Sequence, residues 1–251
     1  MNKVHNNETI DVLLKRRSIR KFDSEWKIKK EDIELIKTVF KNSPTWINGQ
    51  SVSMIIVTDK KIKDEISILC GGQKHINEAS AFIVFIADYN KMIKTWETNN
   101  LEYKLKGNFE STLINVSMHD SGIALANIST ALGSIGYGTV PVGGVRNNME
   151  KLTKLLNLPK HSFPTIGLSV GKNLVESSTV QKPLRFPNNV DIFIDKYNEK
   201  QFNSNDLKKF DIDYEKVKGF KYSNSTHNYW QDKCTVADEV KFYKEVGLYK
   251  K

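Results

Sequence analysis

The 251-residue sequence contains only two cysteines and six prolines, and it has no apolar run long enough to cross a membrane. Cys70 and Cys234 are far apart and lack the spacing of metal ligands, so we expect reduced, half-buried side chains without thiol chemistry. Residues Met1 to Glu8 lack the apolar segment of a signal peptide. With 39% hydrophobic residues, these absences predict an ordinary globular protein of the cytoplasm with no membrane partner.

Signatures of several function classes are absent or incomplete. The sequence has no Gly-x-Gly-x-x-Gly fingerprint and no phosphate loop, and its five histidines form no metal-binding pair, so we expect no metal. The segment Gly167–Gly171 fits the nucleophile elbow around Ser169, and His227 follows in the hydrolase order, which leaves a serine hydrolase open. An elbow needs a helix directly after the serine, but residues 172–187 are irregular, which favours a strand that ends in glycine.

Positive charge is in excess, because 38 Lys and Arg residues oppose 29 Asp and Glu residues and give a formal charge of +9. This excess keeps a basic nucleotide- or nucleic-acid-binding module as a second alternative. The lysines alternate with acids, however, as in Lys29–Asp32, and no recognition helix or RNA-binding signature appears. The charge therefore favours attraction of anionic small molecules, and we expect no nucleic-acid partner.

The strongest local feature is the basic stretch Arg16–Phe22, in which four cations and a hydroxyl follow a short amphipathic segment. In an extended chain Arg16, Ser18 and Arg20 would share one face, and Ile19 would point the other way. Two guanidinium groups and a hydroxyl on one face suit a phosphate or a planar ring rich in acceptors. A solvated basic run at a helix end is the competing interpretation.

Apolar periodicity predicts a chain that mixes helices and strands without a linker. The expected helices are Glu8–Lys15, Lys30–Lys41, Lys60–Leu69, Glu110–Leu132, one capped by Asn147 or Asn148, and two near Asn205–Lys216 and Thr235–Glu245. The expected strands are Val52–Val57, Ala81–Asp88, a short one before Gly143, and Phe163–Val170. We expect one buried stripe on the first helix, a mobile excursion over Tyr89–Asn108, and a single domain over residues 1–251 in which about 172–251 form a C-terminal extension.

Two double glycines mark places where the backbone can approach a ligand. Gly71 and Gly72 permit positive φ angles and precede Gln73, whose amide is a candidate for reading a ligand. Gly143 and Gly144 can present N–H groups to a ligand oxygen or nitrogen at the start of the next helix. A simple surface turn remains the alternative at both places.

Together these segments resemble the flavin-dependent nitroreductase family, in its branch of NAD(P)H-dependent nitroreductases and flavin reductases. The resemblance covers most of the chain and rests on five motifs in order: Arg16–Phe22, Ser43–Gln50, Gly71–His75, Gly143–Asn148 and Lys182–Pro187. It implies an α+β fold with a mixed, mainly antiparallel sheet flanked by helices. It also implies an intertwined homodimer with FMN at the subunit interface.

The resemblance assigns roles residue by residue. The FMN phosphate would be held by Arg16, Arg17, Ser18, Lys182 and Arg185, whereas Arg20 and Gln73 would face the pyrimidine edge of the ring. N–H groups near Gly143 and Gly144 would bond the ring. The loop of Ser43, Pro44, Thr45 and Asn48 would reach the FMN of the partner subunit. No side chain is expected to be a catalytic acid or base, because the cofactor supplies the chemistry.

The implied activity is transfer of a hydride from NADPH or NADH through FMN to nitroaromatics, quinones or free flavin by a ping-pong mechanism. Trp46 stands where small residues are common in the family, and the family's Lys-Pro-Arg order is shifted here to Lys182-Pro183-Leu184-Arg185. In NADPH-preferring relatives two arginines clamp the 2′-phosphate, and alignment on Trp230 puts Lys221 and Thr226 at those positions. We therefore expect at most a mild preference for NADPH.

Overall fold

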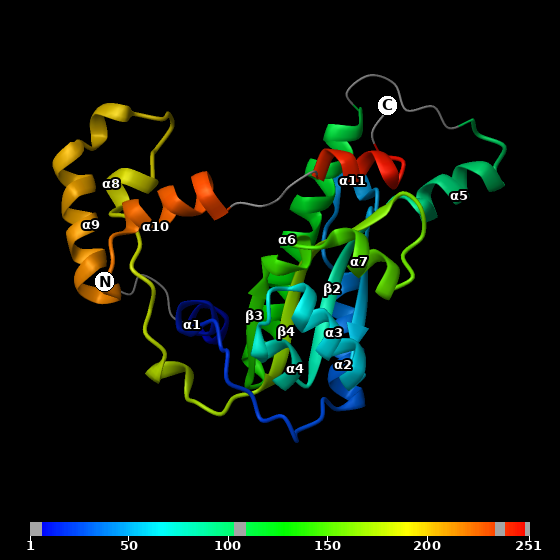
Figure 1. Cartoon of the computed structure of the whole chain (residues 1–251), viewed down its shortest axis with the longest axis horizontal. Helices are drawn as coiled ribbons and strands as arrows, with labels where there is room; N and C mark the ends of the chain where they lie inside the picture. Colours follow the sequence, from blue (N-terminus) through cyan, green and yellow to red (C-terminus); the bar gives the residue numbers. More distant parts are fainter. Residues whose placement is uncertain (1–6, 103–108, 234–238, 249–251) are drawn as a thin grey trace. The chain divides into compact units, whose positions relative to one another are not determined.

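The computed structural model describes residues 7–102, 109–233 and 239–248. The chain forms two compact units, one of Met1–Val180 with Asp238–Lys251 and the other of Gln181–Ala237 (Figure 1). The single domain with an extension from about residue 172 stays a prediction. Cys234 and the first residues of the helix expected at Thr235–Glu245 lie outside the described residues. Within the described ranges, no helix is long and apolar enough to cross a membrane.

The first unit contains an open sheet of four strands in the order β1-β2-β4-β3, and each neighbouring pair is antiparallel. The strands are β1 (Val52–Val57), β2 (Ala81–Asp88), β3 (Tyr137–Val142) and β4 (Ser162–Lys172). The expected bounds of β1 and β2 are confirmed. The central strand β2 is buried on both faces along almost its whole length, which explains its unbroken apolar sequence.

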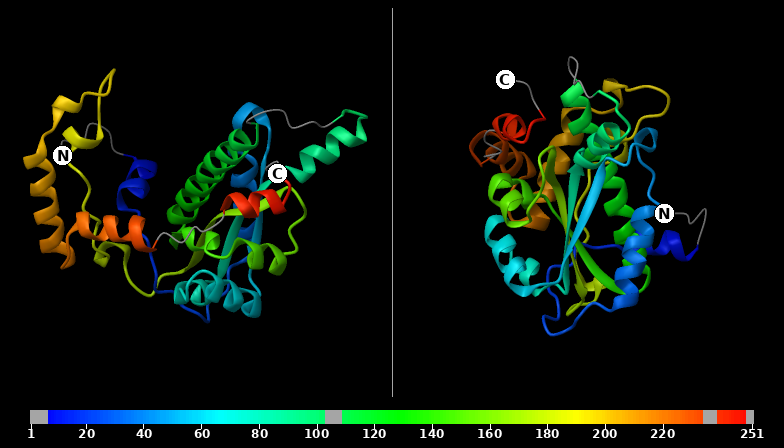
Figure 2. Two further views of the ribbon diagram at one scale, coloured as in Figure 1. Left: turned by 45° about the horizontal axis from the view of Figure 1, so that its top comes forward. Right: turned by 90° about the vertical axis from the view of Figure 1, so that its right-hand side faces the viewer.

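Helices cover both faces of this sheet (Figure 2). One face carries α2 (Lys30–Lys41) and the long α6 (Phe109–Ser134), and the other carries α3 (Lys60–Leu69), α4 (Lys74–Glu78) and α7 (Met149–Leu155). Ile83 and Phe85 of β2 pack in the core cluster that includes α6. Their neighbours Phe82 and Val84 pack in the cluster that includes α3 and α7, as the alternation of side chains in a strand requires.

Two sequence expectations about helices are wrong. The apolar stripe of α1 (Glu8–Lys15) is not buried within the chain, because Leu13 and Leu14 are 54% and 52% exposed. The segment expected to be a mobile excursion contains α5 (Asn90–Thr98), whose Ile93 is buried. Met92, Ile93 and Trp96 recur at helical spacing and pack in or against one core cluster, so the helical period was present in the sequence. The helix α11 (Glu239–Glu245) packs in the same cluster and belongs to the first unit.

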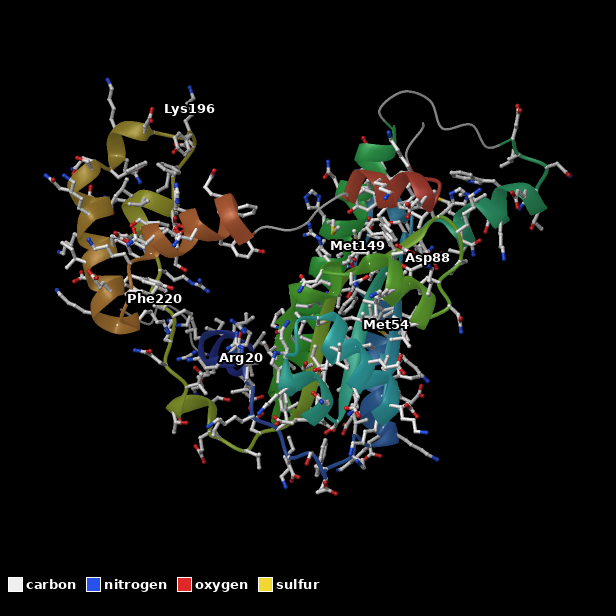
Figure 3. All side chains as sticks on the ribbon, viewed as in Figure 1. Arg20, Met54, Asp88, Met149, Lys196 and Phe220 are labelled. Carbon is white, nitrogen blue, oxygen red and sulfur yellow. The ribbon has the colours of Figure 1, made fainter. Side chains whose placement is uncertain are left out.

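The second unit is small and helical. It contains α8 (Asn188–Asp191), α9 (Ser204–Lys218), α10 (Tyr222–Asn228) and a π-helical turn at Tyr229–Lys233, of which the sequence predicted only α9. A cluster of aromatic rings is centred on buried Phe210, whose ring centroid lies 4.1 Å from that of Phe186. The exposed Phe220 (labelled in Figure 3) packs edge-on against Tyr214 at the rim of this cluster. Aromatic packing of this kind stabilises a unit whose described residues, 181–233, contain no sheet.

Five short 3-10 or π turns complete the described structure: η1 (Trp46–Asn48), η2 (Gly143–Arg146), η3 (Ser177–Thr179), η4 (Glu199–Gln201) and η5 (Tyr229–Lys233). The first two lie at motifs that the sequence singled out. At η1 and η2 the chain turns, and the first N–H groups of each turn have no hydrogen-bond partner within it.

Candidate functional site

The basic stretch leaves α1 in an extended conformation and is fixed to the sheet. Arg16 caps α1 with φ −52° and ψ 132°, and its N–H donates to the carbonyl of Val12 at 2.9 Å. Ser18 forms a parallel bridge with Thr139 of β3, and the N–H of Ile19 donates to the Thr139 carbonyl at 3.1 Å. The stretch therefore runs alongside β3 in the same direction, toward Gly143.

Apolar side chains anchor this stretch and turn its cations outward. Ile19 and Phe22 are each only 1% exposed and pack in one core cluster, whereas Arg16 and Arg20 are exposed (Figure 3, where Arg20 is labelled). The expected division between Ile19 and the arginines is confirmed. Ser18 is half-buried between them.

Arg17 is held differently from its neighbours. Its Nη1 donates to the carbonyls of Leu14 and Arg16 at 3.1 and 2.9 Å, so part of this guanidinium satisfies the end of α1. Its Nε is buried and has no hydrogen-bond acceptor. A buried donor without a partner is costly, and it is typical of a place where an anion or a bound group completes the structure.

The double glycine before Gln73 takes the backbone conformation that the sequence predicted. Gly71 and Gly72 have φ angles of 87° and 74°, which side chains disfavour. The turn brings the Gln73 amide back onto the end of α3, where its Nε2 donates to the carbonyl of Cys70 at 2.8 Å. Cys70 itself is free and only 1% exposed, so it is more deeply buried than expected, and burial raises the pKa of its thiol to about 12.

The Gln73 amide lies against the second double glycine. A β-carbon on Gly144 would lie 2.7 Å from Nε2 of Gln73, so only glycine allows this approach. Gly143 and Gly144 begin η2 directly after β3, and the Oδ1 of Asn148 accepts the N–H of Lys151 to cap α7, as predicted. The structure thus brings together two motifs that are about seventy residues apart in the sequence.

The basic stretch also reaches this place. The positive charge of Arg20 contributes to lowering the pKa of His75, after the larger effect of burial. Arg20 is two residues beyond Ser18, and Ser18 bridges β3 at Thr139. The arginine stretch, Gln73 and Gly144 therefore gather along β3 and the turn that follows it.

The sequence offered Ser169 as a nucleophile, and the structure removes that interpretation. Ser169 lies within β4 and is 0% exposed, so no substrate can reach it. The strand continues to Lys172, so no helix begins directly after the serine. Its Oγ lies 3.0 Å from Nδ1 of His75, but the other ring nitrogen of His75 faces the amide oxygen of Gln73 at 3.1 Å and not a carboxylate. This pair is structural, and a catalytic triad needs a different environment. The sequence missed His75 as a site residue; its place two positions after Gln73 was the available signal.

The loop Ser43–Gln50 lies on a different flank of α6. Ser43 accepts a hydrogen bond from Asn127 of α6 at 3.0 Å, and the N–H of Trp46 donates to buried Asp120 at 3.1 Å. The Oγ1 of Thr45 accepts from the N–H of Gln50 at 3.2 Å, and Asn48 has a positive φ of 53°. Pro44, next to Ser43, is exposed.

Geometry along α6 separates this loop from the basic stretch. Ser129 of α6 lies 2.6 Å from Thr139, which pairs with the basic stretch, whereas Asn127 holds Ser43. Because each residue turns a helix by about 100°, the side chains of Asn127 and Ser129 point to nearly opposite sides of α6. Within one chain, the loop and the basic stretch therefore flank α6 on opposite sides.

Each flank has its own hollow. One of about 560 Å³ lies between α1, α6 and β3, and its lining includes Arg16, Arg17 and the acids Glu8 and Asp11. The other, of about 450 Å³, is lined by residues of the α2 end, the loop and α6, including Ser43, Thr45, Asn48, Lys41 and Asp120. These two hollows share no lining residue, so each flank presents a separate partial site.

The remaining predicted residues belong to the second unit. Lys182 and Arg185 are exposed, and Arg185 directly precedes Phe186 of the aromatic cluster. Lys221 is exposed at the start of α10, whereas the Thr226 hydroxyl donates to the carbonyl of Tyr222 at 2.9 Å. Their roles toward a phosphate stay predictions.

Among the described residues, no group of histidines, cysteines and acids could hold a metal ion. The fold and site instead define an α+β protein with cationic and amide donors arranged along one sheet edge, a set that suits a flat ligand carrying a phosphate. Comparison with protein families matches residues 13–172 to the nitroreductase family. The chain belongs to the nitroreductase family.

Individual proteins show the same likeness. An FMN reductase [NAD(P)H] of Bacillus subtilis (strain 168) is 40% identical over 166 residues, which are 66% of this chain and 66% of that protein. The structure of B. megaterium NfrA2 has a TM-score of 0.86 and 28% identity, covering 98% of this chain and 99% of that one. The NADPH:FMN oxidoreductase from Vibrio harveyi complexed with NAD⁺ has a TM-score of 0.83 and 26% identity, covering 96% and 98%. The fold class predicted from the sequence is confirmed.

Proposed function

We propose that the protein is an FMN-dependent oxidoreductase that uses NADPH or NADH to reduce nitroaromatics, quinones or free flavin in ping-pong order. The observation that carries this proposal is the joint position of Arg20, Gln73 and Gly144 along β3, next to the outward-facing Arg16. Membership of the nitroreductase family and the relatives named FMN reductase and nitroreductase support it. FMN, when bound, supplies the ring that accepts a hydride and passes electrons onward.

The described residues fit FMN in charge and in shape. A phosphomonoester carries close to two negative charges at pH 7, and the exposed Arg16, the incompletely bonded Arg17 and the Ser18 hydroxyl are suitable donors. Nothing lies within 4 Å of the place that a β-carbon of Gly143 would take, so its backbone is open to the close approach that a flat ring needs.

The protein's own residues would then divide the work. The phosphate donors hold the cofactor, whereas Arg20 places a positive charge near the ring and Gln73 offers an amide beside Gly144. A fixed charge near the ring favours added negative charge there without reorganisation of solvent. Because no side chain has to transfer a proton, the pocket can admit several acceptors, and their redox chemistry decides which react.

We further propose that the active form is a homodimer in which the loop Ser43–Asn48 completes the site of the partner subunit. The outward stripe of α6 includes the exposed Gly122, Ile123 and Ala126, and it is flanked by α1 on one side and by the loop on the other. The exposed Leu13 and Leu14 of α1 and Trp46 and Ile47 of the loop extend this apolar surface.

Twofold symmetry explains why the two partial sites lie on opposite flanks. In a twofold interface, α1 of one copy lies beside the loop of the other, and the reverse contact follows from the same operation. Thr45 and Asn48 would then reach the FMN bound at the partner's Arg16–Arg20 stretch. A site within one chain would instead require both motifs on one side of α6. The cytoplasmic location expected from the sequence also stays a prediction.

The test of this function is a visible absorption spectrum of the purified protein. Bound FMN gives yellow protein, and heat release followed by chromatography should identify FMN and not FAD, because the sequence lacks a dinucleotide fingerprint. Addition of NADPH or NADH without oxygen should bleach the flavin bands, and a quinone should restore them. Protein that stays colourless after incubation with FMN would overturn the proposal.

A further inference from the structure

A chain of hydrogen bonds runs from the centre of the sheet to the Gln73 amide. The Oγ of Ser169 lies 3.0 Å from Nδ1 of His75, and Nε2 of His75 lies 3.1 Å from Oε1 of Gln73. The other end of the amide, Nε2 of Gln73, donates to the carbonyl of Cys70 at 2.8 Å. Ser169 and His75 are both buried, so water does not compete along this chain.

The direction of donation along these hydrogen bonds follows from the groups at the Gln73 end. A backbone carbonyl only accepts, so the Gln73 atom that faces Cys70 must be the amide nitrogen, and its oxygen must face His75. An amide oxygen also only accepts, so the hydrogen between His75 and Gln73 belongs to Nε2 of His75.

The state of His75 agrees with that direction. Burial lowers the pKa of His75, and the positive charge of Arg20 lowers it further, so the ring is neutral at pH 7. A neutral imidazole with its hydrogen on Nε2 has a lone pair on Nδ1, which accepts from the Ser169 hydroxyl. Every group in the chain therefore has one defined role.

We propose that His75, fixed by Ser169, is a positioning residue that sets the orientation of the Gln73 amide so that Gln73 offers an N–H donor to the bound flavin. This inference rests on the proposed FMN-dependent function. One N–H of Gln73 is used by Cys70 and its oxygen accepts from His75, so the second N–H is the hydrogen that remains. Because Nε2 of Gln73 lies over Gly144, that hydrogen is presented beside the double glycine.

The arrangement selects for an acceptor on the ligand. A flipped amide would offer an oxygen and would favour a ring N–H, but the flip would put two acceptors against each other at Cys70 and two donors against each other at His75. The site therefore matches a ring carbonyl or an unprotonated ring nitrogen, and the nearby charge of Arg20 favours the same atoms.

The first experiment is a double-mutant cycle that measures the dissociation constant of FMN by flavin fluorescence on dilution of the holoprotein. His75→Leu should raise the constant about three- to tenfold, the value of one neutral hydrogen bond, and His75→Gln, which keeps an N–H donor, should stay within about threefold of the original protein. In a Gln73→Ala background, His75→Leu should add less than about twofold, because the effect acts through Gln73.

A second measurement needs neither FMN nor activity. Nitrogen chemical shifts of the His75 imidazole in the flavin-free protein should show a protonated Nε2 and an unprotonated Nδ1 near pH 7. If His75→Leu does not fold, Ser169→Ala replaces it in the cycle, with an expected rise of about threefold that disappears in the Gln73→Ala background.

The outcomes separate the two proposals. Additive effects of His75 and Gln73 substitutions, or a proton on Nδ1 of His75, would overturn the positioning role while FMN binding by the original protein upholds the function. Failure of the original protein to bind FMN would overturn the function itself and the flavin-directed role of Gln73 with it.

Discussion

Gly144 and Gln73 are packed so closely that the structure admits no side chain at the glycine. A β-carbon there would lie 2.7 Å from Nε2 of Gln73 and 2.8 Å from the carbonyl oxygen of Cys70. Gly143 differs, because nothing lies within 4 Å of the corresponding position. Two adjacent glycines of one motif are thus packed differently, and their substitution by alanine should change the free energy of unfolding by different amounts.

Gly144→Ala should destabilise the free protein by about 1–3 kcal/mol, because the methyl group must displace the Gln73 amide or the Cys70 backbone. The matched control Gly143→Ala should change the free energy of unfolding by no more than about 0.5 kcal/mol. Urea unfolding of both variants without FMN measures the difference. Equal stabilities would show that the contact is easily relaxed.

Arg20→Ala should weaken flavin reduction more than flavin retention, whereas Arg16→Ala should mainly weaken retention. The reason is that the charge of Arg20 acts on His75, which contacts the Gln73 amide, and Arg16 belongs to the proposed phosphate donors. The two variants should be compared by the dissociation constant of FMN and by the rate of flavin bleaching with NADPH. Equal loss of FMN from both variants contradicts this division of roles.

Replacement of exposed Leu14 on α1 by glutamate should break the dimer and release FMN together, because the partner's loop completes the site in our proposal. The matched control is Ile68→Glu on α3, which alters an exposed apolar residue that is 74% exposed on the opposite face of the sheet. Analytical ultracentrifugation at nanomolar concentration with absorbance at a flavin wavelength reads both properties. A flavin-loaded monomer would rule out the shared site.

The protein should use NADPH with at most a mild preference over NADH. Lys221 is a single exposed cation at the start of α10, and the Thr226 hydroxyl already donates within its own helix, which leaves it only as an acceptor. The loss of one charge-assisted contact costs on the order of 1.5–3 kcal/mol, or roughly ten- to a hundredfold in discrimination. The measurement is kcat/KM for both donors, and a preference for NADPH above about a hundredfold contradicts the prediction.

Lys221→Ala should lower kcat/KM for NADPH and leave that for NADH unchanged, whereas Thr226→Val should change neither by more than about twofold. The reason is that, of these two residues, Lys221 is the one that keeps a donor for the 2′-phosphate. A similar loss with both nucleotides would place Lys221 outside the 2′-phosphate site.

Stability should fall as the pH drops below about 6.5, the ordinary pKa of histidine. Burial lowers the pKa of folded His75 and of folded His161, so between the folded and the ordinary values the unfolded chain binds more protons. The stabilising contribution is complete above pH 6.5 and is lost below it. Urea unfolding between pH 7.5 and 5.5 measures this loss. The free energy of unfolding should depend less on pH in His75→Gln than in the original protein, whereas the exposed control His227→Gln should behave as the original protein.

Local patterns in the sequence determined most of the elements. The bounds of α1, α2, α3, β1 and β2 were predictable because each is set by a strong apolar period and by turn residues next to it. The same holds for the turn at Gly71 and Gly72, since positive φ angles depend on the residue itself. α10 was missed because its residues are mainly polar and none of them is buried, so it has no apolar period to read.

The sequence also determined which residue types the site contains, but only the tertiary structure decided how they combine. The pairing of Ser169 with His75 is set by the neighbourhood of β4 and α4, and it turned a suspected nucleophile into a support for Gln73. Likewise, the basic stretch and the loop Ser43–Gln50 lie on opposite flanks of α6 because of which face of that helix packs on the sheet. Contacts between residues far apart depend on burial and geometry of the whole fold, which a linear pattern does not encode.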